Sequence, residues 1–221
     1  MKVGVLFSGG KDSTYAAYLA QKKGHELACL ISVISANEDS YMFHTPAVSL
    51  IPKQAEAMGL PLLQVETKGE KEKELKDLAE AISRAKEAYG IEGVVTGAVA
   101  SVYQASRIEK ICDTLSLKCV NPLWQMDQIG LLKDLVKNRF KVIVTAVAAY
   151  PLDGSFVGRI IDDDYIKEVG ELQKKFKINP AGEGGEFETA VLECPLFAGP
   201  VAAGNYKVTG KDNSFRMVLN P

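Results

Sequence analysis

The chain has 221 residues, 47% of them hydrophobic and 24% charged, and these values exclude a disordered, collagen-like or coiled-coil protein. Its 26 basic and 28 acidic residues give a net charge of −2, so no bulk positive field draws it to nucleic acid or to an anionic membrane. Two histidines and four cysteines without CxxC spacing argue against a zinc site, and favour reduced thiols in a cytoplasmic protein. The N-terminus lacks signal-peptide features, and no run of about 18 apolar residues predicts a membrane helix.

Strand and helix signals alternate over the first 120 residues. Short apolar runs predict strands at 3–7, 27–34, 60–65, 93–99 and from 118 onward. Amphipathic periodicity predicts helices at 13–23, 46–58, 70–89 and 102–115, and glycines end the first three. This alternation predicts an α/β fold, a Rossmann-like parallel sheet with helices on both faces, whose ligands bind beyond the carboxyl ends of the strands.

The pattern changes after Trp124. A helix is expected at 129–139, a buried strand at 141–150, a second helix at 165–175, a strand at 187–194 and a final hairpin over 206–219. We therefore predict two domains, 1–124 and a smaller α+β domain, 125–221. The acidic run Asp162–Asp164 precedes a predicted helix, which favours helix capping over metal binding.

A candidate phosphate loop occupies residues 8–13, SGGKDS, between a predicted strand and a predicted helix. Its two glycines let backbone N–H groups approach a ligand closely, and the helix start adds donors and a positive dipole end. Lys11 and the serine hydroxyls complete a cradle for phosphate oxygens. The loop is not a Walker A motif, because Asp12 follows the lysine. A carboxylate there would act through Mg²⁺ or cap the helix.

A second unusual segment is the loop 179–189, which places Glu183, Glu186 and Glu188 around three glycines. Glycines are entropically costly and like charges repel, so folding alone gives little reason for this composition. Metal ligation, a cationic substrate or proton transfer would each explain it. The alternative is a surface loop with solvated carboxylates.

Several stretches together resemble the diphthine–ammonia ligase family of the PP-loop ATP pyrophosphatase superfamily. SGGKDS is shared by many members of the superfamily, whereas EGGEFET at 183–189 together with NPLW at 121–124 is far more specific. The other similar stretches are 42–46, 96–98 and 103–107, so the resemblance covers almost the whole chain.

The resemblance implies a fold like that of the adenine nucleotide α-hydrolases, with an ATP-binding domain followed by a substrate-binding domain. It implies that ATP adenylates the carboxylate of diphthine on translation elongation factor 2, that pyrophosphate leaves, and that ammonia then forms the amide and releases AMP. Acidic residues could attract the permanent cation of diphthine. The chain has no room for a glutaminase domain, so free ammonia is the simpler nitrogen source. Edge strands could support a homodimer.

The site expected from these motifs has three sets of residues. Nucleotide contacts are expected from Ser8, Gly9, Gly10, Lys11, Asp12, Ser13, His44 and Gly97, with Asp12 also a ligand of Mg²⁺. Substrate contacts are expected from Gln104, Arg107, Glu183, Gly184, Gly185, Glu186, Glu188 and Thr189. Catalytic roles are expected for Lys11, Asp12, Arg107 and Glu186.

Two of these expectations have alternatives. Gln104 and Arg107 lie one helical turn apart, near the predicted ligand crevice, but could belong to a solvated helix face. His44 could contact the nucleotide or only form part of a loop. Two other functions also stay open: a tRNA-modifying PP-loop enzyme, disfavoured by the balanced charge and the absent CxxC, and a nucleotide sensor without turnover, which would not need the EGGEFET carboxylates.

Overall fold

The computed structural model describes residues 1–35, 48–67 and 73–219. Within them the chain forms two compact units. Unit 1 comprises residues 1–8, 12–35, 58–67 and 73–124, and unit 2 comprises 9–11, 48–57 and 125–219. The division is therefore not contiguous in sequence, because the middle of the 8–13 loop belongs to unit 2.

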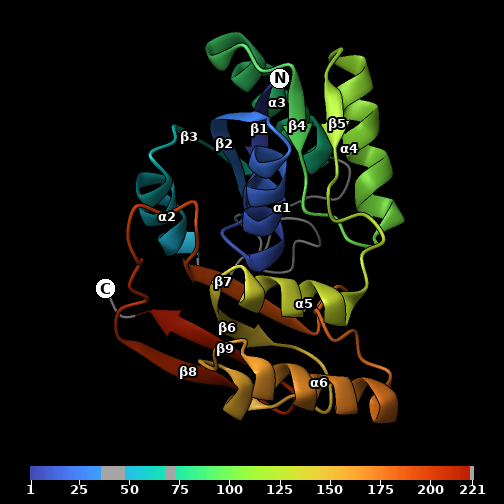
Figure 1. Cartoon of the computed structure of the whole chain (residues 1–221), viewed down its shortest axis with the longest axis vertical. Coiled ribbons are helices and arrows are strands. Elements are labelled where there is room, and N and C mark those ends of the chain that lie inside the picture. The colour runs from blue at the N-terminus through green and yellow to red at the C-terminus, as the bar shows by residue number, and fades with distance from the viewer. Residues whose placement is uncertain (36–47, 68–72, 220–221) are drawn as a thin grey trace. The chain divides into compact units, whose positions relative to one another are not determined.

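Unit 1 contains a five-stranded parallel sheet with the order β3-β2-β1-β4-β5 (Figure 1). Its strands are β1 (Lys2–Leu6), β2 (Glu26–Ser35), β3 (Leu62–Thr67), β4 (Gly93–Val95) and β5 (Lys118–Val120). The helices are α1 (Lys11–Lys22), α3 (Lys73–Tyr89) and α4 (Val102–Thr114). The predicted Rossmann-like sheet is confirmed.

Helices cover both faces of this sheet. The strand order reverses at β1, so right-handed crossovers place α1 on one face and α3 and α4 on the other. In Figure 1, α1 lies in front of the strands. Buried residues of α3 and α4, such as Ile82 and Ile108, share one apolar cluster with Ile31 of β2 and Val94 of β4. Burial of this apolar surface is the main force that holds the layers together.

The fourth strand is shorter than the prediction of 93–99. β4 ends at Val95, and residues 96–100 form a loop. Two residues after the strand, Gly97 lies so close to the start of α1 that an added Cβ would stand 2.8 Å from the Ser13 nitrogen. The backbone beyond β4 therefore passes close to the end of the candidate phosphate loop.

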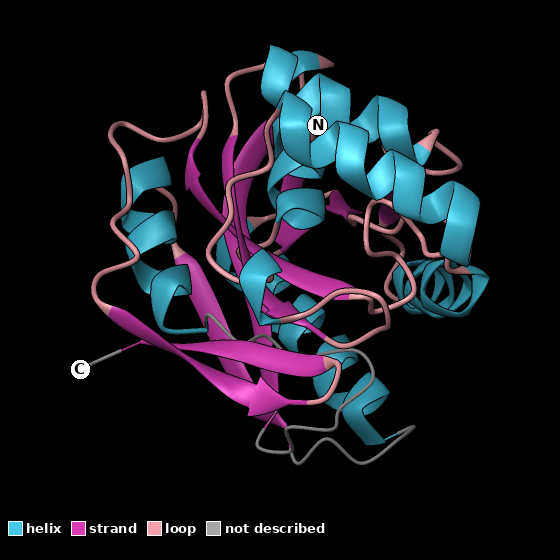
Figure 2. Cartoon of the chain, turned by 90° about the horizontal axis from the view of Figure 1, so that it is seen from below, coloured by secondary structure: helices cyan, strands magenta, loops and turns pink. Residues whose placement is uncertain are grey.

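Unit 2 contains a four-stranded antiparallel sheet with the order β7-β6-β9-β8. Its strands are β6 (Lys141–Val147), β7 (Phe187–Glu193), β8 (Tyr206–Lys211) and β9 (Ser214–Leu219), and β9 leads to the end marked C in Figure 2. The helices are α2 (Ile51–Met58), α5 (Gln128–Lys137) and α6 (Asp163–Phe176), with short 3₁₀ turns η1 (Val48–Leu50) and η2 (Gly154–Phe156). The predicted smaller α+β part is confirmed.

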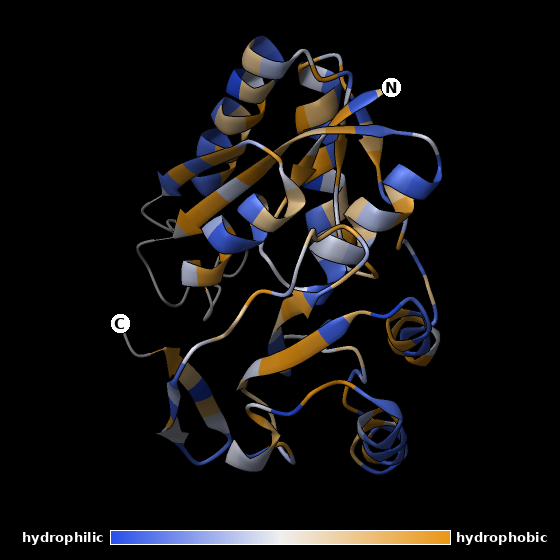
Figure 3. Ribbon diagram, turned by 60° about the vertical axis from the view of Figure 1, so that its left-hand side comes forward, coloured by the Kyte–Doolittle hydropathy of each residue, from blue (hydrophilic) through white to orange (hydrophobic). Residues whose placement is uncertain are grey.

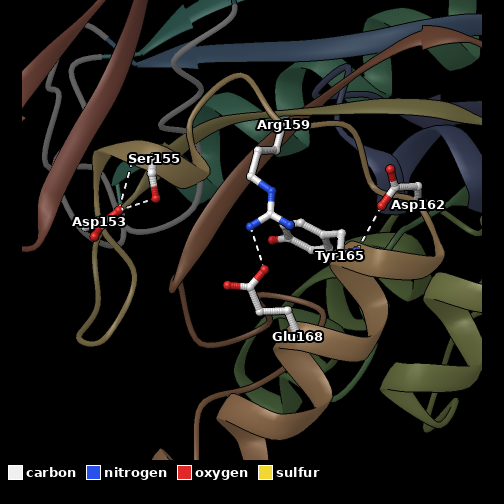
Figure 4. Close-up of polar contacts among 6 residues, drawn as sticks. All are labelled: Asp153, Ser155, Arg159, Asp162, Tyr165 and Glu168. Carbon is white, nitrogen blue, oxygen red and sulfur yellow. Dashed lines mark hydrogen bonds and ion pairs between the residues drawn. The ribbon is translucent and has the colours of Figure 1, made fainter.

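Helix α6 shows how sequence determines local structure in unit 2. The Asp162 carboxylate accepts a hydrogen bond from the Tyr165 backbone N–H at 2.9 Å, which is the N-cap interaction (Figure 4). Asp163 and Asp164 occupy the first turn, where negative charge is favourable. The capping interpretation of this acidic run is confirmed. In Figure 3 the helices show hydrophilic and hydrophobic residues on different sides, as packing against a sheet requires.

Across the described residues, no helix combines the length and apolar content that crossing a membrane requires.

Candidate functional site

The candidate phosphate loop lies between β1 and α1, as predicted. Helix α1 begins at Lys11, so the first N–H groups of the helix belong to the loop itself. The two serines at its ends are joined, because the Ser13 hydroxyl lies 3.1 Å from the Ser8 hydroxyl and 3.3 Å from the Ser8 nitrogen. Gly9 has a φ of +75°, a conformation that favours glycine. A strand-to-helix turn of this geometry is suited to bind an anion.

The middle of the loop is hydrogen-bonded to β7. The Lys11 backbone N–H donates to the Thr189 hydroxyl at 3.1 Å, and the Val191 N–H donates to the Gly9 carbonyl at 3.0 Å. The Lys11 ammonium also lies 5.5 Å from the centre of the Phe187 ring. The structure thus brings together the SGGKDS motif and the FET end of the EGGEFET motif.

Gln54 of α2 is a contact that sequence reasoning missed. Its side chain is fully buried, and its Nε2 donates to the carbonyls of Gly9 and Val191 at 2.9 and 2.8 Å. The residue stands in a short amphipathic helix among other polar residues, so periodicity alone gave no signal. The buried Gln54 side chain therefore stabilises the loop through these two hydrogen bonds.

The acidic loop is organised around one carboxylate. Glu186 is 8% exposed and accepts hydrogen bonds from the Asn179 backbone N–H, the Asn179 Nδ2 and the Gly184 N–H at 2.9, 2.7 and 2.8 Å. Gln128 at the start of α5 also restrains the loop. Its Nε2 donates a hydrogen bond to Asn179 Oδ1, and its Oε1 accepts one from the Ala181 N–H. Glu186 therefore shapes the loop.

The remaining loop residues are more accessible. Glu183 and Glu188 are half-buried, whereas Gly184 and Gly185 are exposed. A Cβ at Gly184 would lie 2.7 Å from the Asn179 side chain and 2.9 Å from Glu186, so the glycine is required by the packing around that carboxylate. The loop thus presents backbone N–H groups and two outer carboxylates on a scaffold set by Glu186.

In unit 1, the loop after β4 lies against the start of α1. Gly97 is in close contact with the backbone of Asp12 and Ser13. Asn121, the first residue of the NPLW motif, holds this loop, because its amide nitrogen donates to the carbonyls of Thr96 and Ala98 at 3.2 and 2.8 Å. This accounts for one residue of a motif that the sequence marked as specific but did not explain.

Helix α4 carries the Gln104–Arg107 pair, and both side chains are half-buried. The Arg107 guanidinium stacks on the Tyr103 ring, with its central carbon 3.4 Å from the ring centre. Ser101 caps the helix by accepting from the Gln104 N–H. Stacking holds the planar guanidinium in one orientation, which suits it to bind a carboxylate or phosphate through two parallel hydrogen bonds.

His44 and the rest of 42–46 lie outside the described residues. Among the described residues, no group of three His, Cys, Asp or Glu side chains could hold a metal ion. All four cysteines are unpaired thiols. Burial raises the pKa of Cys29 and of Cys194 to about 11, while a hydrogen bond from Cys112 lowers the pKa of Cys119.

Comparisons with known proteins identify relatives over nearly the whole chain. The family models described as diphthamide synthase N-terminal domain and diphthamide synthase C-terminal domain match residues 1–119 and 127–209. Human diphthine–ammonia ligase is 36% identical, with 89% of this chain and 80% of that protein covered. The protein of the same name from Schizosaccharomyces pombe is 37% identical, with 89% of this chain and 35% of that protein covered.

Among solved structures, one titled as a predicted subunit of tRNA methyltransferase from Methanocaldococcus jannaschii is 17% identical. It covers 88% of this chain and 98% of its own, with a TM-score of 0.44. A similarity at this level supports no conclusion about function.

Proposed function

Because the chain belongs to the diphthamide synthase family, we propose that it is a C–N-bond-forming ligase that amidates diphthine on translation elongation factor 2 to diphthamide. The hydrogen bond between Lys11 and Thr189 is the observation that carries this proposal at the level of the site. It joins the nucleotide motif of the superfamily to the motif most specific to the family, so both can serve one reaction.

ATP would be held by the loop 8–13. The first turn of α1, the buried Lys11 with which it begins, and the paired serines form a donor set for the oxygens of the pyrophosphate. Gly97 leaves room for a ligand to approach the turn, since a larger residue there would displace Asp12. The residues present therefore fit the nucleotide.

Mg²⁺ would be held by Asp12 together with the phosphates. Asp12 lies in the first turn of α1, beside the predicted phosphate cradle. A single carboxylate is sufficient because Mg²⁺ keeps several waters and usually binds through one or two carboxylates and substrate phosphates. The ion would neutralise phosphate charge there.

The proposed reaction has two steps. In the first, an oxygen of the diphthine carboxylate attacks the α-phosphorus of ATP, the bond to the bridging oxygen breaks and pyrophosphate leaves. In the second, ammonia attacks the acyl carbon of the adenylate, loses a proton, and AMP leaves. Lys11 would stabilise charge on the phosphates, and Arg107, stacked on Tyr103, would hold the α-phosphate or the substrate carboxylate.

The acidic loop would bind the cationic side of diphthine. We assign the electrostatic role to Glu183 and Glu188, which are half-buried, and a loop-shaping role to Glu186, whose carboxylate accepts three hydrogen bonds. Gly184, Gly185 and Thr189 support this surface, and Gln104 would contact the adenylate. His44 stays a proposed nucleotide contact.

One assay tests the proposal. The protein is incubated with ATP, Mg²⁺, ammonium and elongation factor 2 that carries diphthine, and AMP, pyrophosphate and the mass of the factor are followed. We expect AMP in proportion to conversion of acid to amide. Absence of both products would overturn the proposal, and AMP formed only with tRNA would favour a tRNA-modifying enzyme.

A matched pair of variants controls the assay. Asp12→Asn keeps the size of the side chain but removes the charge in the first turn of α1, and we expect it to abolish AMP formation. Asp163→Asn removes the equivalent charge from the first turn of α6, and should leave turnover unchanged. Equal loss in both variants would show that helix stability, and not the site, was measured.

A further inference from the structure

Gln54 is an unusual residue for the interior of a small helix. Its side chain has no exposed surface, and burying an amide is unfavourable unless it is hydrogen-bonded. Both N–H groups are used, one on Gly9 and one on Val191, which lie 45 and 137 residues away in sequence. Within the described residues Oε1 has no hydrogen-bond partner. Through its nitrogen alone, the Gln54 amide therefore connects α2 to the loop at Gly9 and to β7 at Val191.

The target of this amide is a single peptide group. The Gly9 carbonyl accepts from Gln54 and from the Val191 N–H, so both of its lone pairs are used. A peptide group is planar, so fixing the direction of its C=O also fixes the direction of the N–H of the next residue. Gln54 and Val191 thus set the direction of the Gly10 N–H.

The Gly9 backbone agrees with this arrangement. Its φ of +75° is accessible to glycine, and an added Cβ would collide with Gln54 Oε1. The glycine and the glutamine are therefore packed as a matched pair, with the side chain of one occupying the space that the other leaves. A flip of the peptide would break both hydrogen bonds to its carbonyl.

We propose that Gln54 is a positioning residue for ATP, which fixes the Gly9–Gly10 peptide and with it the shape of the loop that binds the pyrophosphate. The inference rests on the proposed function of the loop 8–13 as the ATP site. It adds a residue from outside the recognised motifs, acting through its contact with Gly9.

The test compares ATP binding, turnover and backbone protection in Gln54→Met, which keeps the length of the side chain but has no donor. We expect the KM and the dissociation constant for ATP to rise about 10- to 100-fold, with a much smaller change in kcat and in the KM for the modified factor. Hydrogen exchange of a peptide that covers residues 7–14 should become faster without nucleotide, because the loop loses its restraint.

A second variant supplies a pH signature. In Gln54→Glu an ionised carboxylate would face two carbonyl oxygens, so ATP affinity should fall below that of the Met variant at about pH 8. At lower pH the neutral carboxyl group can donate one hydrogen bond, and affinity should partly recover. A residue that only filled space would not produce this recovery.

Two controls separate positioning from folding. Ala55→Gly weakens the same helix at a buried neighbour by about 1 kcal/mol without touching the loop. Gln64→Met makes the same substitution at an exposed glutamine of β3. Both should bind ATP like the unmodified protein at a temperature well below unfolding.

The outcomes are distinct. If the unmodified protein does not bind ATP, the proposed function and this inference both fail. If it binds ATP and Gln54→Met keeps the same affinity and the same exchange in 7–14, the inference fails and the proposed function stands. If Ala55→Gly loses affinity as much as Gln54→Met does, Gln54 contributes only to helix stability, which also overturns the inference.

Discussion

The backbone N–H of Lys11 donates a hydrogen bond to the hydroxyl of Thr189, a residue 178 positions later in the chain. Both residues are buried, so this contact is shielded from water. A backbone N–H that loses its buried acceptor costs about 1–3 kcal/mol. Thr189 therefore connects the candidate nucleotide loop to the end of the acidic motif through one oxygen atom.

Thr189→Val should weaken ATP binding about tenfold, because it replaces the acceptor of the Lys11 N–H by a methyl group of similar size. Thr189→Ser keeps the hydroxyl and should bind nearly as well as the unmodified protein. Calorimetric titration with ATP checks both variants. Equal affinity in Val and Ser variants would contradict the assignment of Thr189 to loop positioning.

Glu186→Gln should loosen the acidic loop. The substitution places an NH₂ group among three donors, the Asn179 N–H, the Asn179 amide and the Gly184 N–H, and leaves at least one of them unpaired. We expect a loss of about 1–3 kcal/mol in unfolding free energy and faster exchange at Gly184. Denaturant unfolding and hydrogen exchange measure these effects.

Glu183→Gln is the matched control, because this neighbouring side chain is half-buried and lies outside the three-donor cluster. It should leave stability nearly unchanged and raise the KM for the diphthine-bearing factor. A stability loss as large as that of Glu186→Gln would show that the two carboxylates are not separated into loop-shaping and substrate-facing roles.

Arg107→Lys should reduce AMP formation at least about tenfold while the melting temperature changes little. A lysine keeps the positive charge, but it has no planar guanidinium group to stack on the Tyr103 ring or to bind a carboxylate through two parallel hydrogen bonds. The same substitution at Arg84, which is exposed on α3, serves as control. Steady-state rates and thermal unfolding decide between a chemical and a structural role.

Three of the four thiols should react in a defined order with iodoacetamide at about pH 8. The reactive species is the thiolate, so Cys119, which has a lowered pKa and is partly exposed, should be modified first. Cys29 and Cys194 are buried with pKa values near 11 and should resist until the chain unfolds. Peptide mass spectrometry after short exposures measures this order, and early labelling of Cys29 would contradict it.

Periodicity and short motifs predict the layered parts of this fold well. The alternation of buried strands and amphipathic helices predicts the parallel sheet, because its pattern is local. The burial of residues at the ends of helices is less predictable. Val102 continues the apolar stripe of α4 by spacing, yet it is 68% exposed because it is the first residue after the Ser101 cap.

The candidate site is harder to derive, because its supports are long-range. No local signal shows that Gly9 pairs with Val191, or that Gln54 donates to both of their carbonyls. Nor can the sequence distinguish Glu183 from Glu186, since both stand beside glycines. Only the position of Asn179, brought against the loop by the turn after α6, turns one of them into a buried acceptor.

The pairing of Gly9 with Val191 also determines when, during synthesis of the chain, the loop can take its final form. Lys11 of the candidate nucleotide loop is synthesised 178 residues before Thr189 of β7, the strand that completes the hydrogen bonds of the loop. Contacts of such large sequence separation form late, because loop closure must be compensated first. The proposed ATP loop therefore reaches its final form only after β7 has been added, and a nascent chain that already contains the whole parallel sheet still lacks the hydrogen bonds between this loop and β7.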